Sequence, residues 1–223
     1  MDKELAQLKS LLSDVESEQH RDKEFIRGRM GDTSVVLMKC GIGKVNAAVG
    51  AVELITRYAP EVIVSSGCAG GNGEELDVQD IVVSSELCYH DVYCGAAVGE
   101  SVYGQVQGLP ARYAIDTTLL QKATSIAAPV RIVPGLIVTG DWFVDSREKM
   151  QEIIGHFPEA RAIDMESAAI AQVCYIYKVP FISFRVISDI PLRDHKAAMY
   201  HDFWDTIAQN SFQVTRNFIQ SLT

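Results

Sequence analysis

Asp164 and Glu166 form the first pattern in this sequence that could do chemistry. They lie two residues apart, where a short apolar run meets an alanine-rich segment. If the backbone stays extended both carboxylates share one face, and if it turns at Met165 only one of them faces a site. A rigidly held carboxylate can accept hydrogen bonds from two vicinal hydroxyls, a geometry that ribose fits. The competing interpretation is an acid that merely stabilises the start of a helix through the helix dipole.

Ser188 and Asp189 form the second pattern, at the end of an apolar run that begins at Phe181. A carboxyl group at such a place loses hydration, which favours its protonated form and suits a general acid. An acid in this position can also do no more than cap the turn that follows. The pattern alone leaves both interpretations open.

Two glycine-rich segments follow predicted strands. Residues 65–71 read SSGCAGG, which predicts a tight turn where a backbone could approach a ligand closely. A structural turn without a ligand explains that segment equally well. Residues 41–44 read GIGK and lack the full phosphate-binding pattern of nucleotide-triphosphate enzymes, so we assign them no such role.

The elements that must position these residues alternate between strands and helices. Leucines at helical spacing predict a helix from Leu5 to Leu12, and a second helix is predicted at 44–58, with Val45, Val49 and Ile55 on the face that covers a sheet. Alternation of this kind predicts an α/β fold with a parallel or mixed sheet and ligands beyond the carboxyl ends of its strands. Residues 89–111 predict a long loop. The predicted strands are Val35–Met38, Val62–Ser65, Ile81–Ser84, Gly135–Thr139 and Phe181–Ser188.

Composition narrows the class of protein. The 223 residues fit one domain, 1–223, with 48% hydrophobic and 22% charged residues. A formal charge of −9 without a basic cluster argues against nucleic acid, and no apolar run is long enough to cross a membrane. The five cysteines form no C-x-x-C pair and the N-terminus carries no secretory signal, which predicts reduced thiols in the cytoplasm. The histidines lack zinc-type spacing, so we predict no metal and no cofactor.

Taken together, the motifs resemble the nucleoside phosphorylase and hydrolase superfamily, and among its members most closely the 5'-methylthioadenosine/S-adenosylhomocysteine nucleosidases. The resemblance spans essentially the whole chain. It implies a single-domain three-layer α/β/α sandwich around a central mixed, mostly parallel twisted sheet. The blocks that carry it are GIGKVNAA at 41–48, SGCAGG at 66–71, DIVVS at 80–84, GLIVTGD at 135–141, DMESAA at 164–169 and RVISD at 185–189.

The resemblance implies a hydrolase that cleaves the N-glycosidic bond of its substrate and releases adenine. Asp189 would donate a proton to N7 of the adenine, while Ser188 and Arg185 orient it. Glu166 would bind the 2'- and 3'-hydroxyls of the ribose. Glu4, in a segment similar to the family's A-M-x-x-E-L, would handle the attacking water.

The resemblance also implies a set of substrate contacts. Phe143 would stack on the adenine, and the backbone of Val144 would read its Watson–Crick edge. Met165 would pack beneath the sugar, and Tyr200 would lie near the 5'-thio group. Cys68 stands where the family usually has Ser or Thr in contact with the ligand.

Two departures from the family pattern lead to further expectations. The family's first strand, which would precede Met1, is missing, so we expect a version extended by about seven residues to be more stable and more active. Residues 89–110 carry an unusual sequence in the loop that completes the neighbouring subunit's pocket in the family. The resemblance implies a homodimer in which this loop crosses over.

Three alternatives stay open. A phosphate-dependent purine nucleoside phosphorylase would use phosphate in place of water, but such relatives generally place an arginine where this chain has Ser65. A hydrolase of the same superfamily could act on another nucleoside, such as futalosine. A non-catalytic nucleoside-binding protein would keep the fold without the chemistry. Release of free adenine, with and without phosphate, separates these cases.

Overall fold

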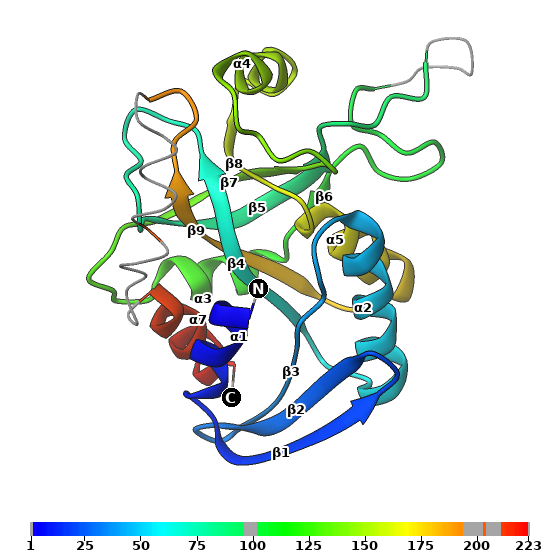
Figure 1. The fold of residues 1–223 in the computed structure, drawn as a ribbon, viewed down its shortest axis with the longest axis vertical. Coiled ribbons are helices and arrows are strands. Elements are labelled where there is room, and N and C mark those ends of the chain that lie inside the picture. Colours follow the sequence, from blue (N-terminus) through cyan, green and yellow to red (C-terminus); the bar gives the residue numbers. More distant parts are fainter. Residues whose placement is uncertain (1, 96–101, 194–202, 204–210, 223) are drawn as a thin grey trace.

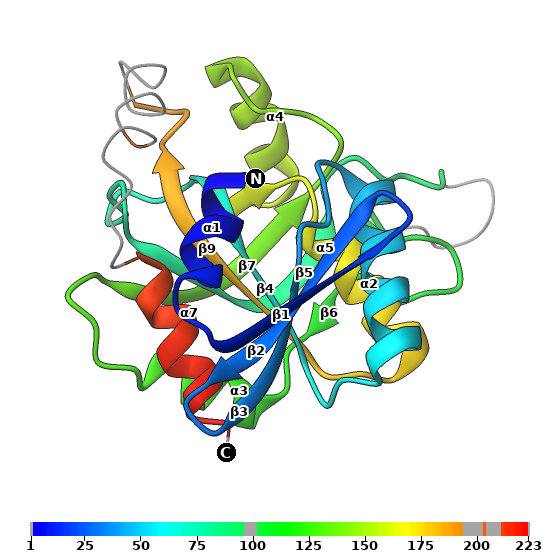
Figure 2. The same cartoon turned by 60° about the horizontal axis from the view of Figure 1, so that its bottom comes forward.

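The computed structural model describes residues 2–95, 102–193, 203 and 211–222. A six-stranded sheet forms the middle layer of the molecule (Figure 1), and helices cover it on two sides. Helices α1, α3 and α7 lie on one side and α2 and α5 on the other, which both views show (Figure 2). The helices are α1 (Asp2–Lys9), α2 (Lys44–Tyr58), α3 (Thr117–Thr124), α4 (Arg147–His156), α5 (Ser167–Tyr177) and α7 (Ser211–Gln220).

The six-stranded sheet is mixed, and its longest ladders are parallel. Its order is β6-β5-β7-β8-β4-β9, with parallel pairing of β5 with β7, β7 with β8 and β4 with β9. Strand β9 also pairs with β5, so the sheet closes on itself instead of staying open, which strand alternation alone does not reveal. The strands are β4 (Ile63–Gly71), β5 (Ile81–Tyr89), β6 (Tyr113–Ala114), β7 (Ile132–Thr139), β8 (Ala160–Asp164) and β9 (Phe181–Asp189).

A separate antiparallel sheet joins β1 (Ser13–His20), β2 (Lys23–Met30) and β3 (Thr33–Met38). The sequence predicted only β3, because β1 reads SDVESEQH and has no apolar alternation to mark it. Among the described residues, β3 pairs only with β2, and β4 pairs only with β9 until it meets β8 at Gly70 and Gly71. Both strands therefore offer an open edge to a further strand. The strand predicted before Met1 lies outside the described residues and stays a prediction.

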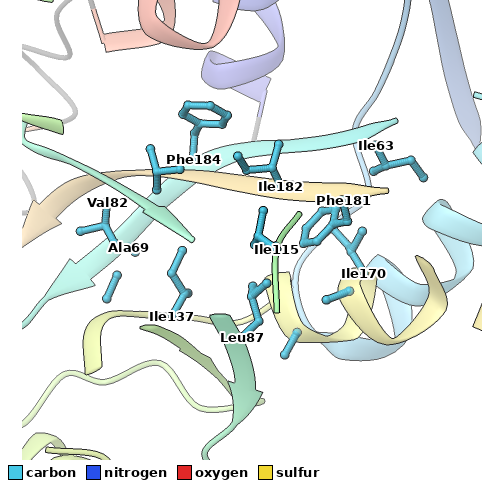
Figure 3. Packing of buried hydrophobic residues seen from close by; sticks show 14 of the residues in the cluster. Ile63, Ala69, Val82, Leu87, Ile115, Ile137, Ile170, Phe181, Ile182 and Phe184 are labelled. Atoms are coloured by element: carbon cyan, nitrogen blue, oxygen red, sulfur yellow. The ribbon is translucent and has the colours of Figure 1, made fainter. Parts of the chain in front are cut away.

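The core lies between the sheet and its helices. Apolar side chains from β4, β7 and β9 gather near α5 (Figure 3), among them Ile63, Ile137, Ile182 and Ile170. Each such side chain contributes about 1.5–3 kcal/mol when it leaves water, so this cluster fixes how the strands sit. Helix α5 is buried on nearly all sides along its first half, which explains its almost unbroken apolar sequence. No helix in the described ranges is long and apolar enough to cross a membrane.

Three local predictions need correction. The helix predicted to reach Leu12 ends at Lys9, and the chain turns there before β1. The glycine-rich segment predicted as a turn is the second half of β4, which continues to Gly71 because Gly70 and Gly71 pair with β8. Helix α2 has the predicted limits and buries Ile55 as predicted, but it turns Ala47 and Ala51 inward in place of Val45 and Val49.

The outward face of α2 is apolar. Val45 is 74% exposed and Val49 is 44% exposed, although the sequence predicted that both would cover the sheet. Small residues were needed on the inward side because α2 packs closely on α5 and β3, where a side chain at Gly50 would meet Met38 and Cys40. The helix thus carries apolar residues on two faces, and in the described structure only one of these faces is packed against other elements.

Candidate active site

A cavity of about 210 Å³ opens at the carboxyl ends of β4, β8 and β9. Helix α1 and the loop after β7 close it from two further directions. The structure places all but one of the predicted site residues around this cavity. Tyr200 lies outside the described residues. Those in the lining are Glu4, Cys68, Phe143, Val144, Met165, Glu166, Arg185, Ser188 and Asp189.

Asp189 is the last residue of β9, and only 8% of its surface is exposed. The Ser188 hydroxyl donates to Asp189 Oδ1 over 2.7 Å, and its oxygen also lies 3.3 Å from the carbonyl of Ala69. The apolar strand buries the carboxyl, and the serine fixes how it points. The geometry supports the predicted pairing of an acid with an orienting hydroxyl.

Glu166 stands at the N-terminal end of α5, where the backbone turns after β8. Its Oε1 accepts a hydrogen bond from the backbone N–H of Gly43 over 3.0 Å. Burial and the neighbouring charge of Asp164 raise the pKa of Glu166. The turn at Met165 answers the question that the spacing left open: Asp164 points inward with no exposed side-chain surface, and Glu166 is the carboxylate held at the pocket wall.

Glu4 reaches the pocket from α1 and is also held in place. Its Oε1 accepts from the backbone N–H of Cys68 over 3.2 Å, and 9% of the residue is exposed. Cys68 therefore contributes its backbone to the site. Burial is the main cause that raises the pKa of the Cys68 thiol well above its usual value, so the sulfur stays neutral.

Arg185 and Asp164 form a buried ion pair beside the pocket. Arg185 Nε donates to Asp164 Oδ2 over 2.6 Å, and Nη2 donates to Ser65 Oγ over 3.0 Å. Burial alone would lower the pKa of Arg185, but the charge of Asp164 and other acids raises it, so Arg185 stays a cation. A Cβ at Gly67 would lie 2.5 Å from Arg185 Nη1, which explains a glycine there. The predicted orientation of Asp189 by Arg185 stays a prediction.

We expect Arg185→Met to lower the free energy of unfolding by about 3–5 kcal/mol, because it leaves Asp164 charged and buried without its partner. Urea denaturation would measure the loss. The double variant Arg185→Met with Asp164→Asn should recover part of it, since the amide carries no charge and can still accept the buried hydrogen bond from Thr139. A double variant less stable than the single one would contradict this account.

The loop after β7 supplies the aromatic wall. Phe143 is 56% exposed at the pocket mouth, and Val144 is buried at 9%. Trp142, which we did not predict, also lines the pocket, and Lys149 Nζ lies 4.7 Å from its ring centroid. An exposed aromatic pair beside a buried acid suits a flat apolar base.

The sequence analysis missed several lining residues. Leu5, Leu8 and Met38 were interpreted as core positions, and no motif marks Cys40. Residues 41–44 were assigned no role in binding a nucleotide triphosphate and Gly43 no other role, yet the Gly43 amide holds Glu166. The signal that could have found it is the pair of glycines at a strand-to-helix junction, where the first amides of a helix bind carboxylates.

The charge of the lining is predominantly negative. It contains the acids Glu4, Asp164, Glu166 and Asp189, together with Arg185 and Lys39. Arg185 is paired with Asp164, and Lys39 Nζ with Asp2. Among the described residues, no group of three or more His, Cys, Asp or Glu side chains is arranged to hold a metal ion.

Comparison with known proteins gives a consistent result. The family model described as the phosphorylase superfamily matches residues 1–220. The 5'-methylthioadenosine/S-adenosylhomocysteine nucleosidase of Geobacillus sp. (strain WCH70) is 38% identical over 225 residues, which span all of this chain and 96% of the relative. The enzyme of the same name from Bacillus subtilis (strain 168) is 36% identical, also over all of this chain and 96% of its own length.

Solved structures agree in fold. The 5'-methylthioadenosine/S-adenosylhomocysteine nucleosidase of Neisseria meningitidis, in complex with methylthio-immucillin-A, superposes with a TM-score of 0.92 at 36% identity, covering 99% of this chain and 96% of that one. The nucleosidase of Colwellia psychrerythraea, in complex with adenine, has a TM-score of 0.91 at 36% identity, covering 100% and 92%. The similarity therefore extends over the whole fold.

Proposed function

This chain belongs to the 5'-methylthioadenosine/S-adenosylhomocysteine nucleosidase family of the phosphorylase superfamily, and on that premise we propose that it hydrolyses both nucleosides to adenine and the corresponding 5'-thioribose. The observation that carries the proposal is the joint placement of Asp189, Glu166 and Glu4 around one cavity. The substrate is inferred from the names of the relatives given above. The side chains around the pocket fit the cleavage of that substrate.

Asp189 is proposed to protonate the departing base. Breaking the C–N glycosidic bond leaves negative charge on the purine, and a proton at N7 removes it. A general acid of this kind contributes about 100- to 10,000-fold in rate. The buried carboxyl with its Ser188 hydrogen bond supports this role, because a group fixed at the end of a strand needs no reorganisation during the reaction.

Glu166 and Glu4 are proposed to serve the sugar and the water. Positive charge develops at C1' and O4' as the bond breaks, and nearby carboxylates stabilise it. Glu166, held by the Gly43 amide, is placed to accept hydrogen bonds from the ribose hydroxyls. Glu4, held by the Cys68 amide, is placed to receive a proton from the attacking water.

Water, and not phosphate, is proposed as the second substrate. A phosphate ion needs an available cation, and both basic residues described in the lining are already paired with carboxylates. Ser65 stands where a phosphorylase would place an arginine, and its hydroxyl accepts from Arg185. The carboxylates of Glu4 and Glu166 in the same lining would repel a phosphate dianion further.

The test of the proposed function is release of free adenine from methylthioadenosine and from S-adenosylhomocysteine by the purified protein, with and without added phosphate. We expect equal rates in both conditions and a free 5'-thioribose as the second product. Dependence on phosphate, with ribose 1-phosphate formed, would assign a phosphorylase. Faster turnover of futalosine in the same panel would change the substrate, and binding without any release of base would assign a nucleoside-binding protein.

We further propose a cytoplasmic homodimer that takes part in methionine salvage. The released thioribose carries the sulfur that salvage recovers, and the five cysteines are free thiols, as a reducing compartment favours. The apolar outer face of α2 supports self-association, because Val45 and Val49 are exposed there and the neighbouring α5 exposes Tyr175 and Ile176 as well. A second copy of the chain would bury this surface.

We expect Val45→Glu with Val49→Glu to convert the dimer to a monomer, since two charges would have to be buried in its interface. Sedimentation velocity would measure the change, and the loss of adenine release per chain would show whether the partner completes the pocket. Val15→Glu is the control, because Val15 is also an exposed valine, at 43%, but lies on β1 of the three-stranded sheet. This variant should stay dimeric. A wild-type chain that sediments as a monomer would overturn the proposal.

A further inference from the structure

A cluster of three charged residues ties together elements that are distant in sequence. Lys44 Nζ lies 2.9 and 2.8 Å from the two carboxylate oxygens of Asp91, just after β5, and 3.8 Å from Asp141, which follows β7 by two residues. The ammonium also lies 5.5 Å from the centroid of the Tyr89 ring. The mechanism proposed above uses none of these three charged residues.

Hydrogen bonds from backbone N–H groups to the two carboxylates connect Lys44, Asp91 and Asp141, and we call these three residues the brace. Asp91 Oδ2 accepts from the backbone N–H of Asp141 over 2.8 Å, and Asp141 Oδ1 accepts from the backbone N–H of Lys44 over 2.8 Å. Asp141 thus caps the start of α2 in place of a side chain from the helix itself. Gly43 has φ +90°, and a Cβ there would lie 2.9 Å from Asp141 Oδ1. The close approach requires glycine at this position.

The brace lies between the two halves of the pocket. On one side, the Gly43 amide, one residue before the braced Lys44, holds Glu166 Oε1. On the other side, Asp141 directly precedes Trp142, Phe143 and Val144, the aromatic wall. A shift of Asp141 would move both the start of α2 and that wall.

We propose that Lys44, Asp91 and Asp141 are positioning residues that fix the Glu166 carboxylate relative to the loop formed by residues 141–144, and hence the ribose relative to the base. This inference rests on the proposed function. The side chains of the three residues are 24%, 27% and 47% exposed, and ion pairs of that exposure contribute little to stability. A misplacement of about 1 Å at a reacting centre can instead cost on the order of 100-fold in rate. The brace should therefore matter more for catalysis than for stability.

The test compares Asp141→Ala and Lys44→Met with the wild type in steady-state kinetics and thermal denaturation. We expect kcat/KM for methylthioadenosine to fall by about 10- to 100-fold in each variant. Lys44→Arg, which keeps the charge facing Asp91, should recover most of that loss. Glu18→Ala is the matched control, because Glu18 is a partly exposed acid bonded to Arg57 far from the pocket; each brace variant should lower the melting temperature by no more than this control does.

A double-mutant cycle shows whether the brace acts through Glu166. Adding Lys44→Met to Glu166→Gln should cost clearly less than Lys44→Met costs in the wild type, because the carboxylate that the brace positions is already gone. Fully additive losses, or a melting temperature that falls in step with activity, would overturn the inference.

Binding keeps this test separate from the proposed function. The 7-deaza analogue of methylthioadenosine, in which carbon replaces N7, probes the pocket by calorimetry without any need for turnover. The inference predicts at least tenfold weaker binding to Asp141→Ala than to the wild type. If the wild type released no adenine but this difference in binding held, the proposed function would fail and the positioning role would stand. Equal binding to both proteins would remove the positioning role.

Discussion

Asp189→Asn is expected to lower kcat for adenine release by about 100- to 10,000-fold, the range that general acid catalysis contributes. The amide has the shape of the carboxyl and can keep the hydrogen bond from Ser188, so the pocket should stay intact. It cannot supply a proton to N7. Steady-state kinetics with methylthioadenosine, together with calorimetric binding of its 7-deaza analogue, would measure both effects.

Binding of the 7-deaza analogue should change by less than about tenfold in this variant, since the base and sugar contacts remain. Asp116→Asn provides the control: Asp116 caps α3 through its side chain, and asparagine caps equally well, so activity should not change. Turnover by Asp189→Asn at the wild-type rate would remove Asp189 from the mechanism. Cleavage of the 7-deaza analogue at the normal rate would show that N7 is not the protonated atom.

Glu166→Gln is expected to lower kcat/KM by about 100-fold or more and to weaken binding as well. Each hydrogen bond from a ribose hydroxyl to a charged acceptor is worth about 1.5–3 kcal/mol, and the same charge stabilises the cationic sugar. Comparing ribosides with 2'-deoxyribosides isolates the sugar contact, because the variant should lose the preference for ribose. Glu152→Gln, at an exposed position on α4, should keep it. An unchanged preference in Glu166→Gln would exclude this role.

The pH profile carries a second signature of Glu166. Burial and the charge of Asp164 raise the pKa of Glu166, and only its ionised form accepts hydrogen bonds from both ribose hydroxyls. As pH is lowered, activity should therefore be lost at a higher pH than it would be with an exposed glutamate. For a carboxyl with a raised folded-state pKa, the contribution to stability is present at low pH and is lost as pH rises through that pKa. Activity and this part of stability should therefore change in opposite directions. In Glu166→Gln the corresponding acid limb should disappear.

The sequence predicted the fold class and which residues gather around the cavity, but not how all the strands pair. Residues such as Asp189 and Glu166 stand at the ends of short apolar strands, and a local pattern is enough to find them. The family resemblance then linked them across the chain. Strand β1 escaped prediction because an exposed edge strand needs no apolar alternation, and β2 escaped because its buried Phe25 and Ile26 are adjacent in sequence and so do not alternate with polar residues. The closure of the main sheet through β5 and β9 is a long-range pairing that no local pattern encodes.

The sequence also did not predict which polar residues pair with each other when they lie far apart along the chain. Nothing near Arg185 in the sequence indicates that its partner is Asp164, 21 residues away. The orientation of α2 was mispredicted because Val45 and Ala47 are both apolar, so periodicity cannot tell which face turns inward. Local patterns therefore located residues that line the cavity, while tertiary packing decided which groups hold them.

The charge of the pocket lining bears on how the protein discriminates between nucleosides and nucleotides. Adenine nucleotides present the same base and ribose as a thio-substituted adenosine, but they add a phosphate ester at the 5' position. Among the described lining residues, Lys39 and Arg185 are already engaged by carboxylates, and Glu4 and Glu166 contribute further carboxylates to the cavity. A phosphate ester that entered the cavity would lose its hydration without gaining an ion pair, which costs free energy. We therefore expect adenylates to compete poorly for the site with an uncharged or zwitterionic thioether, which competition kinetics with AMP would measure.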